Sequence, residues 1–315
     1  MENEVAHDVF PYLRQFKNGT VERLNGTATC PPNTHPTVLS KDVIIDAQTG
    51  VSARLYLPKK TNNTNKRLPL IVYFHGGAFL IASPAEPFYD ASLNSIVDEV
   101  NAVAVSVDYR LAPEHSLPTA YDDCLTALKW ISAHASGSGD EAWLNEHVDF
   151  TRVYLAGDSA GANIAHHVSF RVGSDPELVK PAGIVMIHPY FWSTDPTEYE
   201  LTDPVRKAMV DNWWNFVSPS DKGCDDPLIN PYADGSPDLT GLGCDTLMVC
   251  VAEKDILCDR GKIYYESVLR SGWSGRAELF VTKGEDHVFH IFDPKNEKAG
   301  ELMKSVAEFV NRSRD

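Results

Sequence analysis

Short, unbroken runs of apolar residues alternate along the chain with stretches whose apolar residues recur at helical spacing. Runs rich in Val and Ile are typical of strands that helices cover on both faces. The stretches between them predict helices at 89–100, 121–134 and 162–172. This alternation indicates an α/β fold with a mostly parallel sheet and right-handed crossovers. The predicted strands are 68–74, 102–107, 152–156, 183–188, 245–252 and 277–282.

Two stretches interrupt this alternation. Residues 1 to about 40 precede the first predicted strand, and residues 190 to about 240 carry several tryptophans among Pro and Asp. We expect both to form a cap at the carboxyl edge of the sheet, where ligands bind in parallel-sheet folds. The aromatic side chains would either roof a pocket or pack the interior of the cap. The chain is therefore expected to be a single domain over 1–315, with cap elements at about 1–40 and 190–240.

Charge and composition exclude several classes of protein. The chain has 28 basic and 44 acidic side chains and a net charge of −16, which repels nucleic acid phosphates. It contains no run of about 18 apolar residues, so stable membrane insertion is not expected. Its acidic start differs from a secretory signal, which predicts a cytoplasmic protein. Six scattered cysteines lack metal-ligand spacing and are expected to be free thiols, with no metal bound.

A serine stands in a motif between a predicted strand and a predicted helix. The segment GDSAG (157–161) follows the strand at 152–156 directly. A sharp turn at this place lifts the hydroxyl of Ser159 above the sheet, and the flanking glycines allow close backbone approach. The alternative is a helix start rich in Ser and Gly that has no catalytic role.

A serine hydroxyl needs a base, and the base needs an acid that orients it. His287 follows the strand at 277–282 and is the first candidate for the base, and His290 is the main alternative. Asp255 and Asp259 both follow the strand at 245–252. Asp255 is nearer the strand end, whereas Asp259 is expected to cap the next helix.

A second motif, HGGAF (75–79), follows the strand at 68–74. Consecutive glycines at 76 and 77 allow backbone N–H groups to converge on one point, together with the N–H of Ala160. A negatively charged carbonyl oxygen could be stabilised there. In the nearby segment DYRLAPEH (108–115), Arg110 and Glu114 are expected to form an internal ion pair that braces the loop.

These motifs together resemble a known family. Their combination and order is similar to the hormone-sensitive lipase branch of the α/β-hydrolases, and most closely to class I plant carboxylesterases, whose relatives include gibberellin receptors and 2-hydroxyisoflavanone dehydratases. The resemblance spans nearly the whole chain and implies an α/β-hydrolase fold. It rests on HGGAF, DYRLAPEH, GDSAG, DILCD (255–259) and DHVF (286–289).

The resemblance implies roles for individual residues. Ser159 would be the nucleophile, Asp255 the acid and His287 the base, with oxyanion donors at Gly76, Gly77 and Ala160. Two positions depart from the family pattern: Ala78 replaces a third glycine, and Ile256 replaces a proline. Neither change removes a group with a proposed role.

The implied activity is hydrolysis of a small-molecule carboxylic ester, expected to be a plant metabolite, through an acyl-enzyme and without cofactor or metal. A lyase, dehydratase or cyclase could use the same base, and a receptor could use the same pocket without turnover. Gibberellin receptors of this family lack the catalytic histidine, and the dehydratases often carry threonine at the serine position. Both Ser159 and His287 are present here, which favours a hydrolase. The sequence does not indicate an oligomeric state.

Overall fold

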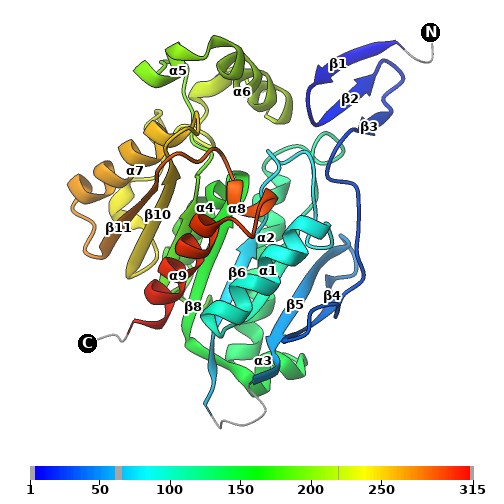
Figure 1. The fold of residues 1–315 in the computed structure, drawn as a ribbon, viewed down its shortest axis with the longest axis vertical. Helices are drawn as coiled ribbons and strands as arrows, with labels where there is room; N and C mark the ends of the chain where they lie inside the picture. Colours follow the sequence, from blue (N-terminus) through cyan, green and yellow to red (C-terminus); the bar gives the residue numbers. More distant parts are fainter. Residues whose placement is uncertain (1–3, 61–65, 219, 313–315) are drawn as a thin grey trace.

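The computed structural model describes residues 4–60, 66–218 and 220–312. Within these residues an eight-stranded sheet has the order β11-β10-β9-β8-β6-β7-β5-β4 (Figure 1). Strands β6 to β11 run parallel, and β5 pairs antiparallel with both β4 and β7. The strands are β4 (Val38–Asp46), β5 (Val51–Pro58), β6 (Leu68–Phe74), β7 (Val103–Asp108), β8 (Val148–Asp158), β9 (Gly183–Ile187), β10 (Thr246–Ala252) and β11 (Arg276–Thr282).

The six predicted strands are confirmed, with ends that differ by a few residues. The antiparallel hairpin of β4 and β5 was not predicted from the sequence. In its outer strand, β4, only Val38 and Ser40 are buried, because this strand lies at the sheet edge. A search for unbroken apolar runs finds buried parallel strands and passes over such an edge strand.

Helices cover both faces of the sheet because successive strand residues point to opposite sides. In β6, Ile71 and Tyr73 belong to one apolar core, while Leu70, Val72 and Phe74 belong to the other. The first core is closed by α1 (Pro87–Val100), α8 (Phe289–Phe292) and α9 (Glu297–Asn311). The second is closed by α2 (Thr119–Ala135), α4 (Ala160–Gly173) and α7 (Cys258–Ser271), and the short α3 (Ala142–His147) precedes β8.

Two stretches far apart in sequence lie beyond the same end of the sheet (Figure 1). The first is a small antiparallel sheet, and the second contains two helices from the predicted insertion. They meet where Trp213 Nε1 donates to the carbonyl of Phe10 at 2.9 Å and its ring packs against that of Tyr12 in a tilted arrangement. These elements are β1 (Val5–Val9), β2 (Leu13–Phe16), β3 (Val21–Arg23), α5 (Glu198–Thr202) and α6 (Pro204–Val217), followed by the 3₁₀ turns η2 (Gly223–Asp225) and η3 (Leu239–Gly241).

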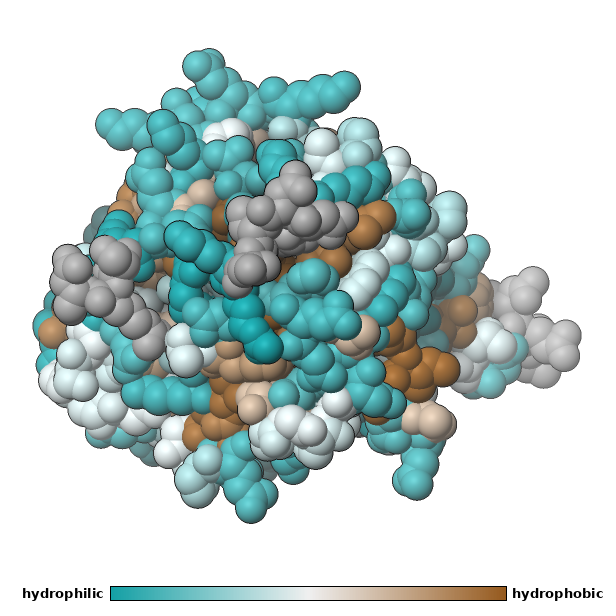
Figure 2. All heavy atoms as spheres, turned by 90° about the horizontal axis from the view of Figure 1, so that it is seen from below, coloured by the Kyte–Doolittle hydropathy of each residue, from teal (hydrophilic) through white to brown (hydrophobic). Residues whose placement is uncertain are grey.

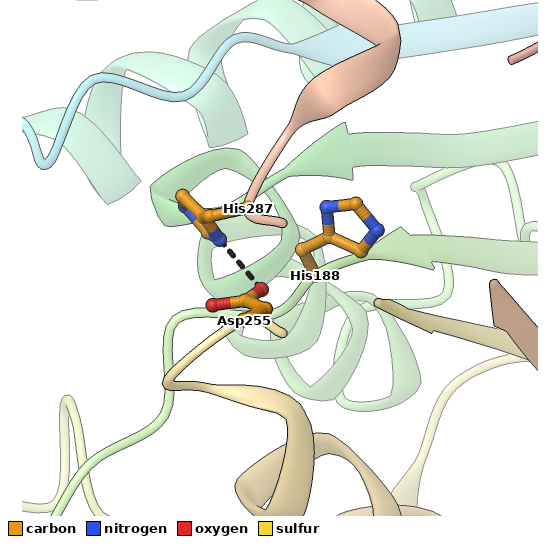
Figure 3. Close-up of side chains that lie close together, drawn as sticks. All are labelled: His188, Asp255 and His287. Atoms are coloured by element: carbon orange, nitrogen blue, oxygen red, sulfur yellow. Dashed lines mark hydrogen bonds and ion pairs between the residues drawn. The ribbon is translucent and has the colours of Figure 1, made fainter. Parts of the chain in front are cut away.

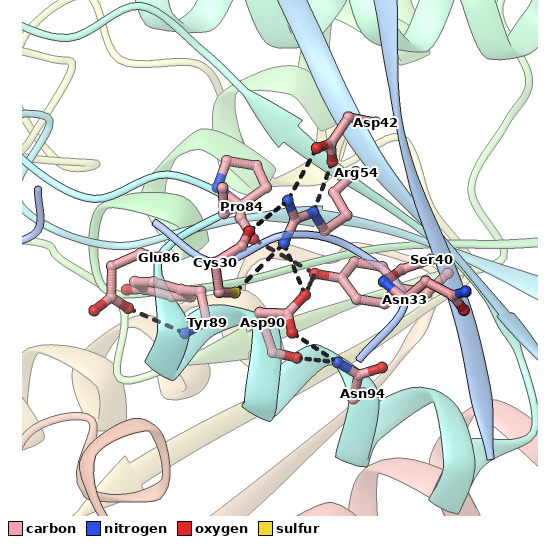
Figure 4. Close-up of polar contacts among 12 residues, drawn as sticks. Cys30, Asn33, Ser40, Asp42, Arg54, Pro84, Glu86, Tyr89, Asp90 and Asn94 are labelled. Atoms are coloured by element: carbon pink, nitrogen blue, oxygen red, sulfur yellow. Dashed lines mark hydrogen bonds and ion pairs between the residues drawn. The ribbon is translucent and has the colours of Figure 1, made fainter. Parts of the chain in front are cut away.

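The segment that joins β3 to β4 is fixed by a buried arginine (Figure 4). Arg54 on β5 binds Asp42 on β4 at 2.7 Å and Asp90 on α1 at 3.0 Å. It also donates to the carbonyl of Cys30 at 3.0 Å. Because Arg54 is only 1% exposed and its charge is balanced by two carboxylates, this network anchors the entry to the sheet.

The expected ion pair between Arg110 and Glu114 is wrong. Arg110 binds Asp123 on α2 at 2.7 Å, and Glu114 binds Arg23 on β3 at 2.6 Å. Arg110 meets a charge on the next helix, and Glu114 meets one on a strand 91 residues away, so proximity along the loop did not decide the pairing. The loop is still braced, and Glu114 ties it to the N-terminal sheet.

Two further expectations concern membrane insertion and the state of the cysteines. In the described ranges, none of the helices has the length and apolar character needed to cross a bilayer. The end of the molecule opposite the cap presents mainly hydrophilic residues, with hydrophobic ones in small separate areas (Figure 2). All six cysteines are free, as expected, and five of them are buried.

A buried ion pair joins helix α5 to α7. Arg260 donates through Nε to Glu200 Oε1 at 2.6 Å, and the Glu200 side chain is fully buried. The Glu200→Ala variant should lose about 3–5 kcal/mol of unfolding free energy in urea titrations, because it leaves the buried guanidinium without a counter-ion. Glu266→Ala, which breaks the exposed pair with Arg270, is the control and should change stability little. Equal losses in the two variants would contradict this role of Glu200.

Candidate active site

Ser159 lies on a sharp turn between β8 and α4. Its backbone has φ 52° and ψ −117°, a region that non-glycine residues seldom adopt. The turn is packed so closely that a Cβ at Gly161 would lie 1.8 Å from the carbonyl oxygen of Phe74. Glycine is therefore required at this position, and the close approach of the backbone holds the serine above the strand ends.

The structure brings Ser159, His287 and Asp255 together. The Oγ of Ser159 lies 3.0 Å from His287 Nε2. On the other side of the ring, His287 Nδ1 lies 2.7 Å from Asp255 Oδ2 (Figure 3). Asp255 is fully buried, and its second oxygen accepts the N–H of Leu257. Each of the three residues follows a strand of the parallel sheet, so the strand ends meet at one site.

The alternative candidates for the base and the acid, His290 and Asp259, lie away from Ser159. His290 is buried on α8 with neither ring nitrogen hydrogen-bonded among the described residues. Asp259 lies in the first turn of α7 and is paired with Lys262. The N-cap of α7 is Leu257, so the expectation that Asp259 caps this helix is wrong. Asp259 instead lies two residues farther on, near the positive end of the helix dipole.

The surroundings of His287 act on its proton affinity in opposite directions. Burial lowers the pKa of His287, while the charge and hydrogen bond of Asp255 raise it. The charges of Asp158 and Asp286 also raise it, and the net result is a pKa above the usual value for histidine. The site is therefore suited to a histidine that takes up a proton during a reaction.

His188 is a site residue that the sequence reasoning missed. It directly follows β9, and its Nδ1 accepts the N–H of Val288 at 2.8 Å. Its ring lies beside His287 (Figure 3), and burial lowers its pKa well below the usual value, so the ring is neutral. The position at the carboxyl end of a predicted strand was the available signal. His188 supports the loop that carries His287.

His188, Asp255 and His287 place three possible metal-ligand atoms within 4.8 Å of one another. However, His287 and Asp255 are already hydrogen-bonded to each other, and His188 Nδ1 is occupied by Val288. A cation held by all three side chains would have to disrupt the bond between His287 and Asp255. The donor set thus fits a hydrogen-bonded relay better than a metal site.

The hydrogen bonds of the turn at 75–79 argue against Gly76 as an oxyanion donor. The N–H of Gly76 donates to Asp158 Oδ1 at 3.1 Å and to the hydroxyl of Tyr89 at 2.9 Å. A single N–H that already has two acceptors cannot also serve an oxyanion, so the assignment of Gly76 conflicts with the geometry. The N–H groups of Gly77, Ala78 and Ala160 have no acceptor in the described part of the chain. Ala78 was noted as a departure from the family pattern but was not predicted to be a donor, although it follows the two glycines in the same turn.

A cavity of about 80 Å³ opens at Ser159 and His287. The N-terminal sheet supplies Tyr12 to its wall, and α6 supplies Met209, Val210 and Trp213, so both cap stretches line it. By contrast, Trp192 and Trp214 are fully buried and pack the interior of the cap. Some cap aromatics therefore enclose the pocket, as Trp213 does, while others pack the interior of the cap. Burial raises the pKa of Tyr12 to about 12, so its phenol stays protonated.

Arg206 on α6 links the cap to the two loops that carry Asp255 and His287. Its guanidinium binds Asp286 at 2.8 Å and the carbonyl of Lys254 at 3.3 Å. The charge of Arg206 is therefore balanced by a residue adjacent to His287. This contact holds helix α6 over the cavity.

Comparison with known proteins agrees with this geometry. A family model described as alpha/beta hydrolase fold matches residues 71–291. The chain belongs to this family. It is 53% identical to "Probable carboxylesterase 2" of Arabidopsis thaliana, over 99% of this chain and 98% of that protein. It is 42% identical to "2-hydroxyisoflavanone dehydratase" of Glycyrrhiza echinata, over 98% and 96% of the two chains.

Among solved structures, the α/β-hydrolase chain is similar to EstE1, a thermostable carboxylesterase cloned from a metagenomic library. The TM-score is 0.73 at 30% identity, and the match covers 88% of this chain and 90% of the other. The sequence-based fold prediction is thus confirmed, and so is the resemblance to plant carboxylesterases.

Proposed function

We propose that this chain is a serine carboxylesterase that uses Ser159, His287 and Asp255 as a catalytic triad. The observation that carries the proposal is the pair of hydrogen bonds that links the serine to the histidine and the histidine to the buried aspartate. Carboxylic ester hydrolysis is also the activity in the names of a plant relative and a structural neighbour.

The proposed reaction has two steps. His287 Nε2 takes the proton of Ser159 as its Oγ attacks the ester carbonyl, and Asp255 holds the imidazole in the tautomer that can accept it. The imidazolium then gives this proton to the departing alcohol. Water, deprotonated by the same histidine, attacks the acyl-enzyme and releases the acid.

We assign the oxyanion donors to the N–H groups of Gly77, Ala78 and Ala160. They stand in the two turns beside Ser159, and each lacks an acceptor in the described residues. Ala160 begins α4, so its N–H also carries the positive end of the helix dipole. These donors would stabilise the charge that develops on the carbonyl oxygen.

The cavity supports a small-molecule ester with apolar groups. Its walls are mainly aromatic and aliphatic side chains beside Ser159 and His287. Similarity to plant enzymes supports a plant metabolite as the natural ester. A lyase on this scaffold is the second candidate because of the dehydratase relative, but the contact between Ser159 and His287 favours acyl transfer.

Two further proposals concern the domain organisation and the cellular compartment. The whole chain forms a single domain with cap elements at about 1–40 and 190–240, which is supported by the shared cavity that Tyr12, Trp213 and Ser159 line. The six free cysteines support residence in a reducing compartment such as the cytoplasm.

An organophosphate such as diisopropyl fluorophosphate tests the proposed function. The protein should hydrolyse p-nitrophenyl acetate, and the reagent should abolish this hydrolysis while it adds one phosphoryl group to the peptide that contains Ser159. Mass spectrometry of the digested protein locates the group. Heat-unfolded protein is the control and should not be labelled, because an unactivated serine is a poor nucleophile. Hydrolysis that survives complete labelling of Ser159 would contradict the proposal.

A further inference from the structure

Asp158 immediately precedes Ser159 and is completely buried. Its carboxylate accepts three hydrogen bonds: from the hydroxyl of Tyr73 at 2.8 Å, from the hydroxyl of Tyr89 at 2.9 Å and from the N–H of Gly76 at 3.1 Å. These donors come from β6, from α1 and from the turn at 75–79. The side chain thus joins the serine turn to the turn that carries two of the proposed oxyanion donors.

We propose that Asp158 is a positioning residue that fixes the turn at Gly76, Gly77 and Ala78 relative to Ser159. The proposal rests on the proposed function, because it concerns the placement of the oxyanion donors. It assigns to the carboxylate a role distinct from that of Asp255, which contacts His287 directly.

Asp158 packs closely against the turn at Gly76. A Cβ at Gly76 would lie 2.3 Å from Asp158 Oδ2 and 2.8 Å from the Tyr89 hydroxyl. The peptide of Gly76 therefore rests on the carboxylate, and the N–H groups of the next two residues are placed by it. Oxyanion stabilisation requires donors within about 2.7–3.1 Å of the oxygen, so a displacement of about 1 Å at this turn would be felt in kcat.

The charge of the carboxylate is also unusual. A buried carboxylate is costly unless hydrogen bonds or a cation stabilise it, and the bonds found here come from two phenols and one amide. Burial raises the pKa of Asp158 above its usual value, and the hydrogen bonds and the charge of protonated His287 offset part of this rise. Asp158 and the imidazolium of His287 therefore stabilise each other.

Several groups face His287 from the elements packed around it. Asp255 lies before α7 and Asp286 precedes His287 itself, with Arg206 of α6 bound to Asp286. Two neighbouring histidines, His188 after β9 and His290 on α8, are kept neutral by burial. Asp158 at the end of β8 is thus one of three carboxylates whose charge favours protonated His287.

Asp158→Asn tests the proposal in the full-length protein. The carboxylate accepts on both oxygens, whereas an amide must direct its NH₂ group at one of the present donors. With p-nitrophenyl acetate we expect kcat to fall about 10- to 100-fold while KM stays within about threefold. The acid limb of the kcat/KM profile should move to lower pH, because a charge that raises the pKa of His287 is gone.

Asp123→Asn is the matched control. Asp123 is a buried aspartate that binds Arg110, so its loss should lower stability without moving the acid limb. If Asp158→Asn does not fold, Tyr73→Phe and Tyr89→Phe each remove one donor with little change of shape, and each should lower kcat about 3- to 10-fold. Retention of kcat within about threefold in the folded variants, or an unmoved acid limb in Asp158→Asn, overturns the proposal.

Organophosphate labelling separates this proposal from the proposed function. The Asp158→Asn protein keeps Ser159 and His287, so it should still be labelled at Ser159, but more slowly than the parent. Absence of labelling in the parent would refute the triad itself. A normally labelled parent together with unchanged turnover in Asp158→Asn would refute only the positioning role.

Discussion

Replacing Ser159 with alanine should reduce kcat/KM for p-nitrophenyl acetate by about 10⁴-fold or more. The variant removes the oxygen that lies 3.0 Å from His287 Nε2 and that would form the acyl-enzyme. Only the oxyanion donors and substrate binding would remain, and in serine hydrolases these supply a small residual rate. Steady-state kinetics of the purified variant, with an upper bound set by the uncatalysed reaction, give the measurement.

Ser169→Ala is a control on the same helix. Ser169 is fully buried and donates to the carbonyl of His166, so its loss probes the packing of α4 without touching the site. We expect this variant to keep kcat/KM within about threefold of the parent. If Ser159→Ala retained activity within about tenfold of the parent, Ser159 would not be the nucleophile.

Asp255→Asn should be the second most damaging change, with a loss of about 10⁴-fold in kcat. The carboxylate accepts the N–H of His287 Nδ1, which leaves Nε2 free to take the serine proton. An asparagine that donates to Nδ1 would favour the opposite tautomer, in which Nε2 already carries a hydrogen. Because the charge of Asp255 also raises the pKa of His287, the acid limb of the residual activity should move to lower pH.

Asp259→Asn is the control for this variant. The two aspartates stand four residues apart in the same motif, but Asp259 pairs with Lys262 on α7 and has no contact with His287. Its replacement should change kcat less than threefold and leave the pH profile in place. A large loss in Asp259→Asn, or a mild one in Asp255→Asn, would show that the acid has been assigned to the wrong residue.

The main sheet could be predicted from the sequence because buried parallel strands leave a local signature. Most of the strands from β6 to β11 contain runs of apolar residues, and the predicted site residues follow strand ends within about five residues. The carboxyl ends of parallel strands share one edge of a sheet, so residues at these ends are brought close together. This reasoning led to Ser159 and to a short list of acids and bases, from which the family resemblance selected Asp255 and His287. The structure brings these three residues into contact.

Other features depend on partners that no local pattern reveals. Arg110 and Glu114 are near each other in the loop but bind Asp123 and Arg23, respectively. In the same way, the sequence suggested Gly76 as a donor to an oxyanion, although Asp158 and Tyr89 already accept its N–H. The direction of a side chain or an N–H group follows from packing between distant segments.

By itself, the sequence determined the parallel sheet and the order of the motifs, because these depend on local hydrophobic patterns and on strand ends. The same motifs, through their resemblance to a known family, selected the three residues of the proposed triad. Only the tertiary structure decided which N–H groups remain free, how Tyr12 and Trp213 enclose the cavity, and that Asp158 supports the turn beside Ser159. The physical reason is that hydrogen bonds saturate: a donor is available for chemistry only if no neighbour in the folded chain has already taken it.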